Sequence, residues 1–264
     1  MNINTNTEKL LAHKDGAAGW ITFNNPAKRN AMSYEMWLGL DIALDAFIAD
    51  PAIRVIVLKG AGDKAFVSGA DISEFKEKRA NPQMVAEFNK VSGAIAEKLQ
   101  NCLKPTIAMI RGFCMGGACH VAMSCDLRIA APDAVFAIPA ARLSIVYGVS
   151  ATRKLMSLVG VSNAKRILYS AGRFDAAEAL RIGFVNELAD DPQAAAAALM
   201  DTLAANAPLT IAGAKVLLNG LATGTGALDP LQADAVIDRA VSSADYLESV
   251  RAFRAKRAPR FEGR

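Results

Sequence analysis

Histidine and cysteine are both scarce in this chain of 264 residues. With only His13 and His120 available, a metal site built from several imidazoles is excluded. The four cysteines fall in one segment and lack the spacing of zinc ligands; they are Cys102, Cys114, Cys119 and Cys125. Because disulfides are rare in the cytosol, we expect reduced, packed thiols and no bound metal.

A targeting or membrane-spanning pattern is also missing. Residues 1–8 have neither the basic start nor the apolar stretch of a signal peptide. The longest nearly uncharged apolar run lies between Arg111 and Asp126 and is too short to cross a bilayer. We expect a soluble, cytoplasmic protein without a membrane partner.

Strong charge of either sign is absent, since the net charge is +4. Basic residues nevertheless gather near the end of the chain, between Arg251 and Arg264. Such a cluster could bind a small molecule that carries phosphate groups, although most clusters of this kind are simply the solvent-exposed face of a helix. No aromatic residues alternate with the basic ones as they do in RNA-binding motifs, so we do not expect a nucleic-acid partner.

The apolar content of 52% is ample for a buried core. The pattern begins with a hairpin, with strands at residues 9–13 and 19–24. Ser33 then precedes a predicted helix with a 3.6-residue apolar stripe. The stripe consists of Met36, Leu40, Ala43, Leu44 and Phe47.

One unit then recurs with variation: an apolar strand, a glycine-bearing turn and a helix. Residues 53–58 lead to a helix near Asp71, and residues 106–110 lead to a helix that ends near Ser124. A third, looser copy has strands at 127–130 and 135–138. The repetition predicts an α/β fold in which strand-and-helix units form a spiral and the ligand-binding loops gather at one end.

From about Gln193 the composition becomes rich in alanine, and no strand signal follows. Breaks at Ala207-Pro208 and in the glycine-rich stretch 220–226 divide this part into helices. We predict a core at residues 1–199 and a helical oligomerisation region at residues 200–264. Apolar helices that project from a core usually bury themselves on a neighbour, so a homo-oligomer is expected.

Two glycine-punctuated segments, 65–72 and 111–120, carry most of the chemical information. Each follows an apolar strand and precedes a predicted helix, so each can direct unpaired backbone N–H groups at one bound oxygen. Two donors on separate loops are what an oxyanion hole requires, and a helix that begins at Gly117 adds the positive end of its dipole. The alternative is that Gly116-Gly117 only lets a helix pack close to a strand.

Further motifs surround these segments along nearly the whole chain. They are Asn25-Pro26-Ala27-Lys28-Arg29-Asn30-Ala31-Met32, Phe66-Val67-Ser68-Gly69-Ala70-Asp71-Ile72, Arg111-Gly112-Phe113 with Gly116-Gly117, Ser124-Cys125-Asp126, Phe136-Ala137-Ile138-Pro139, residues 179–186, and Phe253-Arg254-Ala255-Lys256-Arg257. Together these motifs resemble the enoyl-CoA hydratase/isomerase (crotonase) family.

The resemblance implies a ββα spiral core with a C-terminal helical trimerisation region, often paired into hexamers, and an acyl-coenzyme A substrate. It implies that the N–H groups of Ala70 and Gly117 hold the thioester oxygen. The backbone near Ala31, Ser68 and Ile72, with Ala70 and Asp71 between them, would hold the adenine and pantetheine. Lys28 or Arg29, with Phe253 and Lys256, would meet the nucleotide end. Coenzyme A is then part of the substrate, and no tightly bound cofactor is expected.

The chain departs from the family at two places. Family members that hydrate enoyl-CoA carry two glutamates that share the water, and this chain has His120 and Ala140 at those positions. Hydration needs an acid and a base, and Ala140 can be neither. His120 lies one helical turn after Gly117, so it can be an acid, a base or a hydrogen-bond donor of the site. The alternative is a core histidine whose polar atoms are hydrogen-bonded within the protein.

Tyr147 resembles in position a tyrosine of the methylmalonyl-CoA decarboxylase branch, which also lacks the paired glutamates; alternatively, it only packs. Decarboxylation generates its own carbanion and needs no initial base. The sequence therefore predicts an acyl-CoA enzyme in which lyase or isomerase chemistry is as well supported as hydration. The alternative is an acyl-CoA-binding protein without catalytic activity.

Four apolar residues would line an acyl cavity or the ordinary core; they are Phe75, Met84, Phe88 and Leu143.

Overall fold

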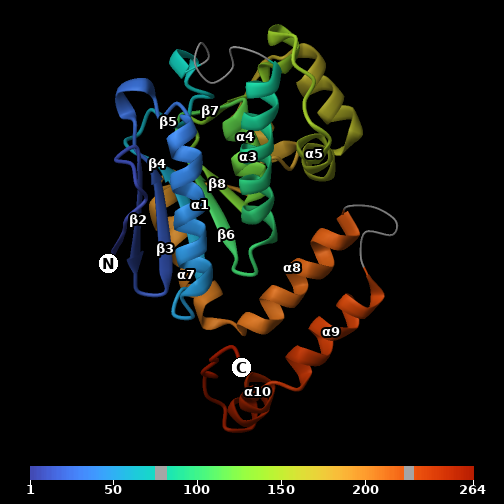
Figure 1. The fold of residues 1–264 in the computed structure, drawn as a ribbon. Coiled ribbons are helices and arrows are strands. Elements are labelled where there is room, and N and C mark those ends of the chain that lie inside the picture. Colours follow the sequence, from blue (N-terminus) through green and yellow to red (C-terminus); the bar gives the residue numbers. More distant parts are fainter. Residues whose placement is uncertain (75–81, 223–228) are drawn as a thin grey trace.

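The computed structural model describes residues 1–74, 82–222 and 229–264. Within these residues a large sheet has seven strands in the order β1-β2-β3-β4-β6-β8-β11 (Figure 1). Their bounds are Asn2–Ile3, Leu10–Asp15, Ala18–Phe23, Val55–Gly60, Thr106–Ile110, Leu127–Ala130 and Glu187–Leu188. The first three strands pair antiparallel, and every pairing from β3 to β11 is parallel.

A second sheet of four strands, in the order β10-β9-β7-β5, lies beside the first. Its strands are β5 (Ala65–Val67), β7 (Phe113–Met115), β9 (Val135–Ala137) and β10 (Arg173–Asp175). Each repeated unit gives one strand to each sheet: β4 and β5, β6 and β7, β8 and β9. This confirms the predicted spiral, and it shows that a second, three-residue strand is hidden in the first two glycine-bearing turns.

Helix α1 (Tyr34–Ala49) begins where the sequence predicts, because the Met36 amide donates to the Ser33 hydroxyl at 3.3 Å and caps the helix. All five residues of its predicted apolar stripe are buried in the main core. The helix packs on β2, β3 and α3 (Pro82–Asn101). It therefore closes one face of the large sheet.

The helices that follow the strands differ in length. After Asp71 the described residues form only a 3₁₀ turn, η2 (Ile72–Glu74), so the expected helix near Asp71 lies largely outside them. Helix α4 spans Gly117–Ser124 as predicted. A 3₁₀ turn, η3 (Pro139–Leu143), follows β9, and α5 (Val149–Ser170) is interrupted at Gly160, whose φ of 73° is not helical. Helix α6 (Ala176–Arg181) connects β10 to β11.

The remaining helices are α7 (Pro192–Ala205), α8 (Pro208–Ala222), α9 (Pro230–Val241) and α10 (Ala244–Arg254). Helix α7 crosses the predicted boundary at 199/200 and packs on β4, β6 and β8. Helices α8 to α10, called the helical arm below, extend from the core at the end away from β5 and β7 (Figure 1). The break at Ala207-Pro208 is confirmed, and residues 223–228 of the second predicted break lie outside the described residues.

Among the described residues no single helix is long and apolar enough to span a membrane. Only α7 and α8 taken together reach the required length and composition, and they are bent by 106° at the break between them.

Candidate active site

Three parallel strands of the small sheet end side by side, and each leads into one loop of the candidate site. Val67 of β5 pairs with Cys114 of β7, and Met115 of β7 pairs with Ala137 of β9. The Gly116 amide donates to the Ala137 carbonyl at 2.8 Å, which ties the second loop to the third. Carboxyl ends of parallel strands are the usual place for ligand loops, so segments 68–71, 116–117 and 138–140 form one candidate site.

Ala70 and Gly117 each have an amide that the fold leaves unpaired. The Met32 amide donates to the Gly69 carbonyl at 2.8 Å, and the Met32 carbonyl accepts from the Asp71 amide at 2.9 Å. This β-bridge lies opposite Ala70 but uses neither its N–H nor its carbonyl. Gly117 is the first residue of α4, where an amide has no partner within the helix. In the described parts of the chain neither amide donates to another protein group. Both are therefore available to a bound oxygen.

His120 and Tyr147 approach each other beside the second loop. Their ring centroids lie 6.3 Å apart with the planes at 65°. His120 projects from α4, one turn after Gly117, and Tyr147 lies just before α5, where its carbonyl accepts from the Thr152 hydroxyl at 3.1 Å. The structure thus brings together two residues that the sequence singled out separately.

Both rings keep a buried polar atom without a hydrogen-bond partner among the described residues: Nε2 of His120 and the hydroxyl of Tyr147. Buried polar groups in proteins are nearly always paired, and an orphaned one needs an explanation such as catalysis or a missing ligand. Two orphaned groups on adjacent rings favour a polar site over ordinary core packing.

Burial sets the protonation of both rings. It lowers the pKa of His120 to about 4, with a further contribution from the positive charge of Lys154. Burial also raises the pKa of Tyr147 well above its usual value, and the neighbouring Cys119 and Cys114 add to this effect. At pH 7 the imidazole is therefore neutral and the phenol keeps its proton.

No carboxylate of the described residues interacts with the rings of His120 and Tyr147. No Asp or Glu in the described part of the chain is hydrogen-bonded to His120 or Tyr147 or contributes to the pKa shift of either. Ala140 occupies the third loop and is 8% exposed, and its carbonyl accepts from the Ile145 amide at 3.0 Å. The local chemistry thus rests on a phenol, a neutral imidazole and backbone amides.

Most of the residues expected to hold coenzyme A gather beside the first loop. The Lys28 ammonium contacts the Asp71 carboxylate at 2.9 Å and the Ser73 hydroxyl at 2.8 Å. The Ser68 hydroxyl donates to the Lys28 carbonyl at 3.2 Å, and the Ala31 amide donates to the same oxygen at 3.1 Å. Ile72 opens the following 3₁₀ turn.

Asp71 is only 6% exposed and already engaged. Burial alone would raise the pKa of its carboxyl group, but hydrogen bonds from Ser73 and the Lys28 ammonium lower it overall. The carboxylate therefore stays ionised and holds Lys28 in place, and it is poorly suited to proton transfer.

The Arg29 carbonyl accepts from the Ser68 amide at 3.1 Å, but the side chains of Arg29, Phe253 and Lys256 do not join this cluster within one chain. The Arg29 guanidinium lies 5.2 Å from the ring centroid of Phe113, at the amino end of β7. Phe253 is 86% exposed on α10, and Lys256 follows that helix. The tail beyond them is bound by Arg54, just before β4, whose guanidinium donates to the Phe261 carbonyl at 3.2 Å. The tail that follows the helical arm thus meets the core at the amino end of β4.

The cysteines are free thiols, and all four are buried. Burial raises the pKa of Cys125 to about 12, so this thiol is not a nucleophile at neutral pH. No group of three or more His, Cys, Asp or Glu side chains in residues 1–74, 82–222 and 229–264 is placed to hold a metal ion.

Two hollows bear on the choice of site. One, of about 280 Å³, is lined by Tyr34, Met84, Glu87 and Phe88, and it lies near the first loop because Glu74 accepts from the Tyr34 amide at 2.8 Å. Of the predicted cavity residues, Met84 and Phe88 are therefore at a hollow, Leu143 is exposed, and Phe75 lies outside the described residues.

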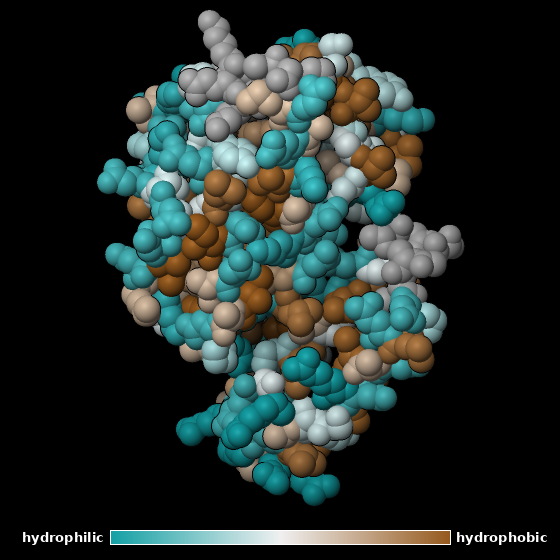
Figure 2. All heavy atoms as spheres, in the orientation of Figure 1, coloured by the Kyte–Doolittle hydropathy of each residue, from teal (hydrophilic) through white to brown (hydrophobic). Residues whose placement is uncertain are grey.

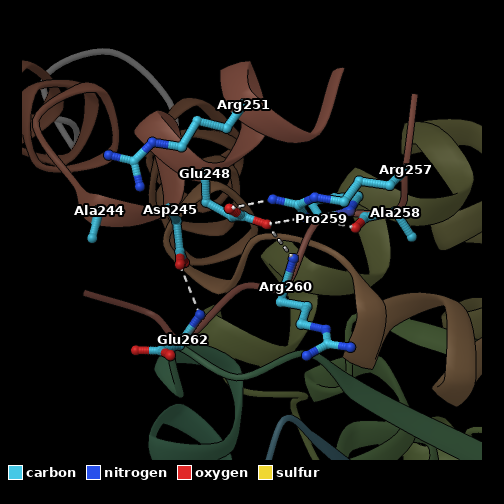
Figure 3. A pocket seen from close by; sticks show the side chains of 9 residues that line it. All are labelled: Ala244, Asp245, Glu248, Arg251, Arg257, Ala258, Pro259, Arg260 and Glu262. Atoms are coloured by element: carbon cyan, nitrogen blue, oxygen red, sulfur yellow. Dashed lines mark hydrogen bonds and ion pairs between the residues drawn. The ribbon is translucent and has the colours of Figure 1, made fainter. Parts of the chain in front are cut away.

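A second hollow, of about 860 Å³, is formed by α10 and the tail (Figure 3). It lies away from β5 and β7 and the loops that follow them (Figure 1). Its two central carboxylates are already used to hold the tail. Asp245 accepts from the amides of Glu262 and Gly263 at 2.7 and 2.8 Å, and Glu248 accepts from the Arg257 guanidinium at 2.6 Å. This hollow has a structural explanation and is not the candidate active site.

Comparison with known proteins agrees with the fold. The model of the enoyl-CoA hydratase/isomerase family matches residues 14–264. A short-chain-enoyl-CoA hydratase of Clostridium acetobutylicum is 34% identical over 212 residues, which are 80% of each chain. A 2,3-dehydroadipyl-CoA hydratase of Escherichia coli is 30% identical over 97% of this chain and 99% of its own.

A crystal structure of an enoyl-CoA hydratase/carnithine racemase from Magnetospirillum magneticum superimposes with a TM-score of 0.92 at 33% identity, covering 98% of this chain and 97% of its own. Two mixed sheets wound as a spiral and followed by C-terminal helices define an α/β enzyme of the crotonase fold. The chain belongs to the enoyl-CoA hydratase/isomerase family, whose members act on coenzyme A thioesters.

Proposed function

We propose that this protein is a lyase that decarboxylates a malonyl-type acyl-CoA thioester. The observation that carries the proposal is a pair of buried polar groups without a hydrogen-bond partner, Nε2 of His120 and the hydroxyl of Tyr147. They lie beside the loop that presents the unpaired Gly117 amide. The resemblance places the glutamates of family hydratases at positions 120 and 140, and here these positions hold a neutral imidazole and a methyl group.

The chemistry follows from the groups that are present. When the carbon–carbon bond to the substrate carboxylate breaks, CO₂ leaves and the electron pair remains as a thioester enolate. The N–H groups of Ala70 and Gly117 stabilise the enolate oxygen, and such preorganised donors are usually the largest single contribution to catalysis. No base is required for this step, which agrees with the finding that no carboxylate of the described residues is hydrogen-bonded to either ring.

The second step is delivery of a proton to the α-carbon. Tyr147 carries its proton at neutral pH, because burial raises its pKa, whereas His120 is neutral. We assign proton delivery to the Tyr147 hydroxyl, which then regains a proton from water, and hydrogen bonding in the site to His120. The cluster around Lys28, Ser68 and Asp71 is proposed to hold the coenzyme A moiety.

The test compares substrates and variants of the purified protein. We expect turnover of methylmalonyl-CoA or ethylmalonyl-CoA to exceed hydration of crotonyl-CoA. Tyr147→Phe should lower kcat by roughly 10²- to 10⁴-fold with little change in KM, since it removes only the proton donor. Tyr169→Phe is the matched control, because Tyr169 lies on α5 with its side chain 73% exposed.

Two outcomes would contradict the proposal. Rapid hydration of crotonyl-CoA that survives both Tyr147→Phe and His120→Ala would show that hydration proceeds without these rings. Tight binding of acyl-CoA with no turnover across a panel of thioesters would instead identify a binding protein that lacks catalytic activity.

A further inference from the structure

Lys154 is a buried cation beside the candidate site that takes no part in the proposed chemistry. It belongs to α5 and is only 7% exposed. It shares the buried stripe of that helix with Ala151, Leu155 and Val159. A lysine at such a position gives up most of its hydration, so it needs a specific partner.

The partner of Lys154 is a hydroxyl that also binds the backbone of His120. The Lys154 ammonium donates to the Ser124 hydroxyl at 2.9 Å, and the Ser124 hydroxyl donates to the His120 carbonyl at 2.8 Å. One hydroxyl is thus acceptor and donor at once, an arrangement in which the two hydrogen bonds polarise each other. It joins α5 to α4 at the turn that carries the imidazole.

The location of the charge is also favourable for the helix. Ser124 is the last residue of α4, where the carbonyl groups give the helix a partial negative charge. A cation fixed there stabilises the last turn of a helix only eight residues long. The same cation also raises the cost of placing a second positive charge on the His120 imidazole.

Several ionisable groups from the neighbouring elements face this cation and the imidazole. Glu97 of α3 and Cys125, which follows α4, raise the pKa of Lys154, whereas burial lowers it more strongly, to about 8. Lys154 therefore remains charged at pH 7. Tyr147 contacts the His120 ring and is uncharged. In the described chain, Lys154 is the one ionisable group that contributes to the shift of His120.

We infer that Lys154 is a positioning residue for His120: its ammonium, fixed by Ser124, holds the end of α4 beside Tyr147 and opposes a positive charge on the imidazole. This inference rests on the proposed function for its catalytic meaning. With His120 uncharged, the phenol of Tyr147 is the proposed proton donor of the site, and the imidazole can accept or donate a hydrogen bond without adding charge near the enolate.

The experiment uses the small number of histidines in the chain. In a His13→Gln background, His120 is the only imidazole, so its pKa can be followed directly by NMR. Lys154→Met removes the charge and keeps the length, Lys154→Gln removes the charge and keeps a polar end, and Lys154→Arg keeps the charge. Both neutral variants should raise the pKa of His120 by at least about half a unit, because they remove the repulsion. Lys154→Arg should leave it near 4.

The acidic limb of kcat/KM should move upward in pH in the two neutral variants and stay in place in Lys154→Arg. If the neutral variants leave the His120 titration unchanged, Lys154 is a structural residue and the inference is wrong, whatever their melting temperatures. The NMR titration needs no turnover. A titration that moves while no thioester is consumed by the wild type would overturn the proposed function and leave the role of Lys154 intact.

Discussion

Gly117 offers a way to remove one donor from the candidate site without changing any side-chain contact. It is the first residue of α4, a position where proline is favoured because its missing N–H would be unpaired in any case. A Cβ atom built on Gly117 meets no atom within 4 Å, so a side chain has room there.

Gly117→Pro should therefore fold normally and lower kcat by roughly 10²- to 10³-fold, or about 3 to 4 kcal/mol of transition-state stabilisation. Gly117→Ala is the matched control, since it adds a Cβ but keeps the N–H. The measurement is kcat on a malonyl-type thioester, with circular dichroism to check the fold. Equal losses in the two variants would show that crowding, and not the missing donor, is responsible.

Not every residue of the site could have been found from the sequence. Glycine spacing indicates the two loops, and helix periodicity puts His120 one turn after Gly117. The family resemblance assigns the amide donors of Ala70 and Gly117 and the position of Tyr147. Lys154 was missed, because a lysine in a helix is usually taken to be solvated. A local signal did exist, since Lys154 lies three residues after Ala151 and one before Leu155, on the apolar stripe of α5. Arg29 could not be separated from Lys28, because the direction of a side chain depends on a contact with the distant Phe113.

Among the elements, one carboxylate contributes to the connection between α8 and the core, beside hydrogen bonds from Lys215 and Asn219 to backbone carbonyls. Asp126 accepts from the amide and hydroxyl of Thr106 at 2.8 and 2.9 Å, and from the Lys215 ammonium at 2.8 Å. Lys215 belongs to α8 and is 7% exposed. The sequence analysis assigned Asp126 no chemical role, and in the structure it joins β6, β8 and α8.

Asp126→Asn should lower the free energy of unfolding by about 2 to 3 kcal/mol, because it leaves a buried ammonium without its counter-charge. The partly exposed position of Asp126 keeps the loss below that of a fully buried pair. Lys215→Met should cost less, and adding it to Asp126→Asn should restore part of the loss. Urea unfolding at one fixed protein concentration measures all four proteins. Strictly additive losses would show that the two charges are not coupled.

The accuracy of the predicted elements depended on their length. Strand β6, helix α4 and strand β8 have the predicted bounds. Strands β5 and β7 were missed because three residues carry too little periodicity to be recognised. They exist because β7 can pair with β5 on one side and β9 on the other, a condition that depends on the folded arrangement.

At the scale of the whole molecule, the helical arm leaves apolar side chains at the surface. Leu218 and Leu221 of α8 and Leu231 of α9 are 67%, 68% and 78% exposed. Figure 2 shows such apolar side chains among polar ones over the lower part of the molecule. Exposed apolar residues at this density are typical of a surface that binds another chain.

Phe253 of α10 and Lys256, which follows that helix, are the residues that the resemblance assigns to the nucleotide end of coenzyme A. In one chain α10 lies away from the end of the molecule that holds β5 and β7 (Figure 1). A second copy could bring them to a substrate that this copy alone does not reach. We therefore propose a homotrimer or hexamer in which the helical arm contacts a neighbouring copy.

This proposal predicts a solution mass of three or six times the 27.9 kDa of one chain, measurable by light scattering after size exclusion. Leu231→Asp should shift the mass toward the monomer, because a buried charge at an apolar interface is costly. Leu11→Asp is the control, since Leu11 is 46% exposed on β2, away from the arm.

Phe253→Ala should raise KM for acyl-CoA more than it lowers kcat, because a residue that binds the nucleotide end is remote from the reacting carbon. A monomeric wild type that is fully active would remove the reason for placing Phe253 and Lys256 at any active site.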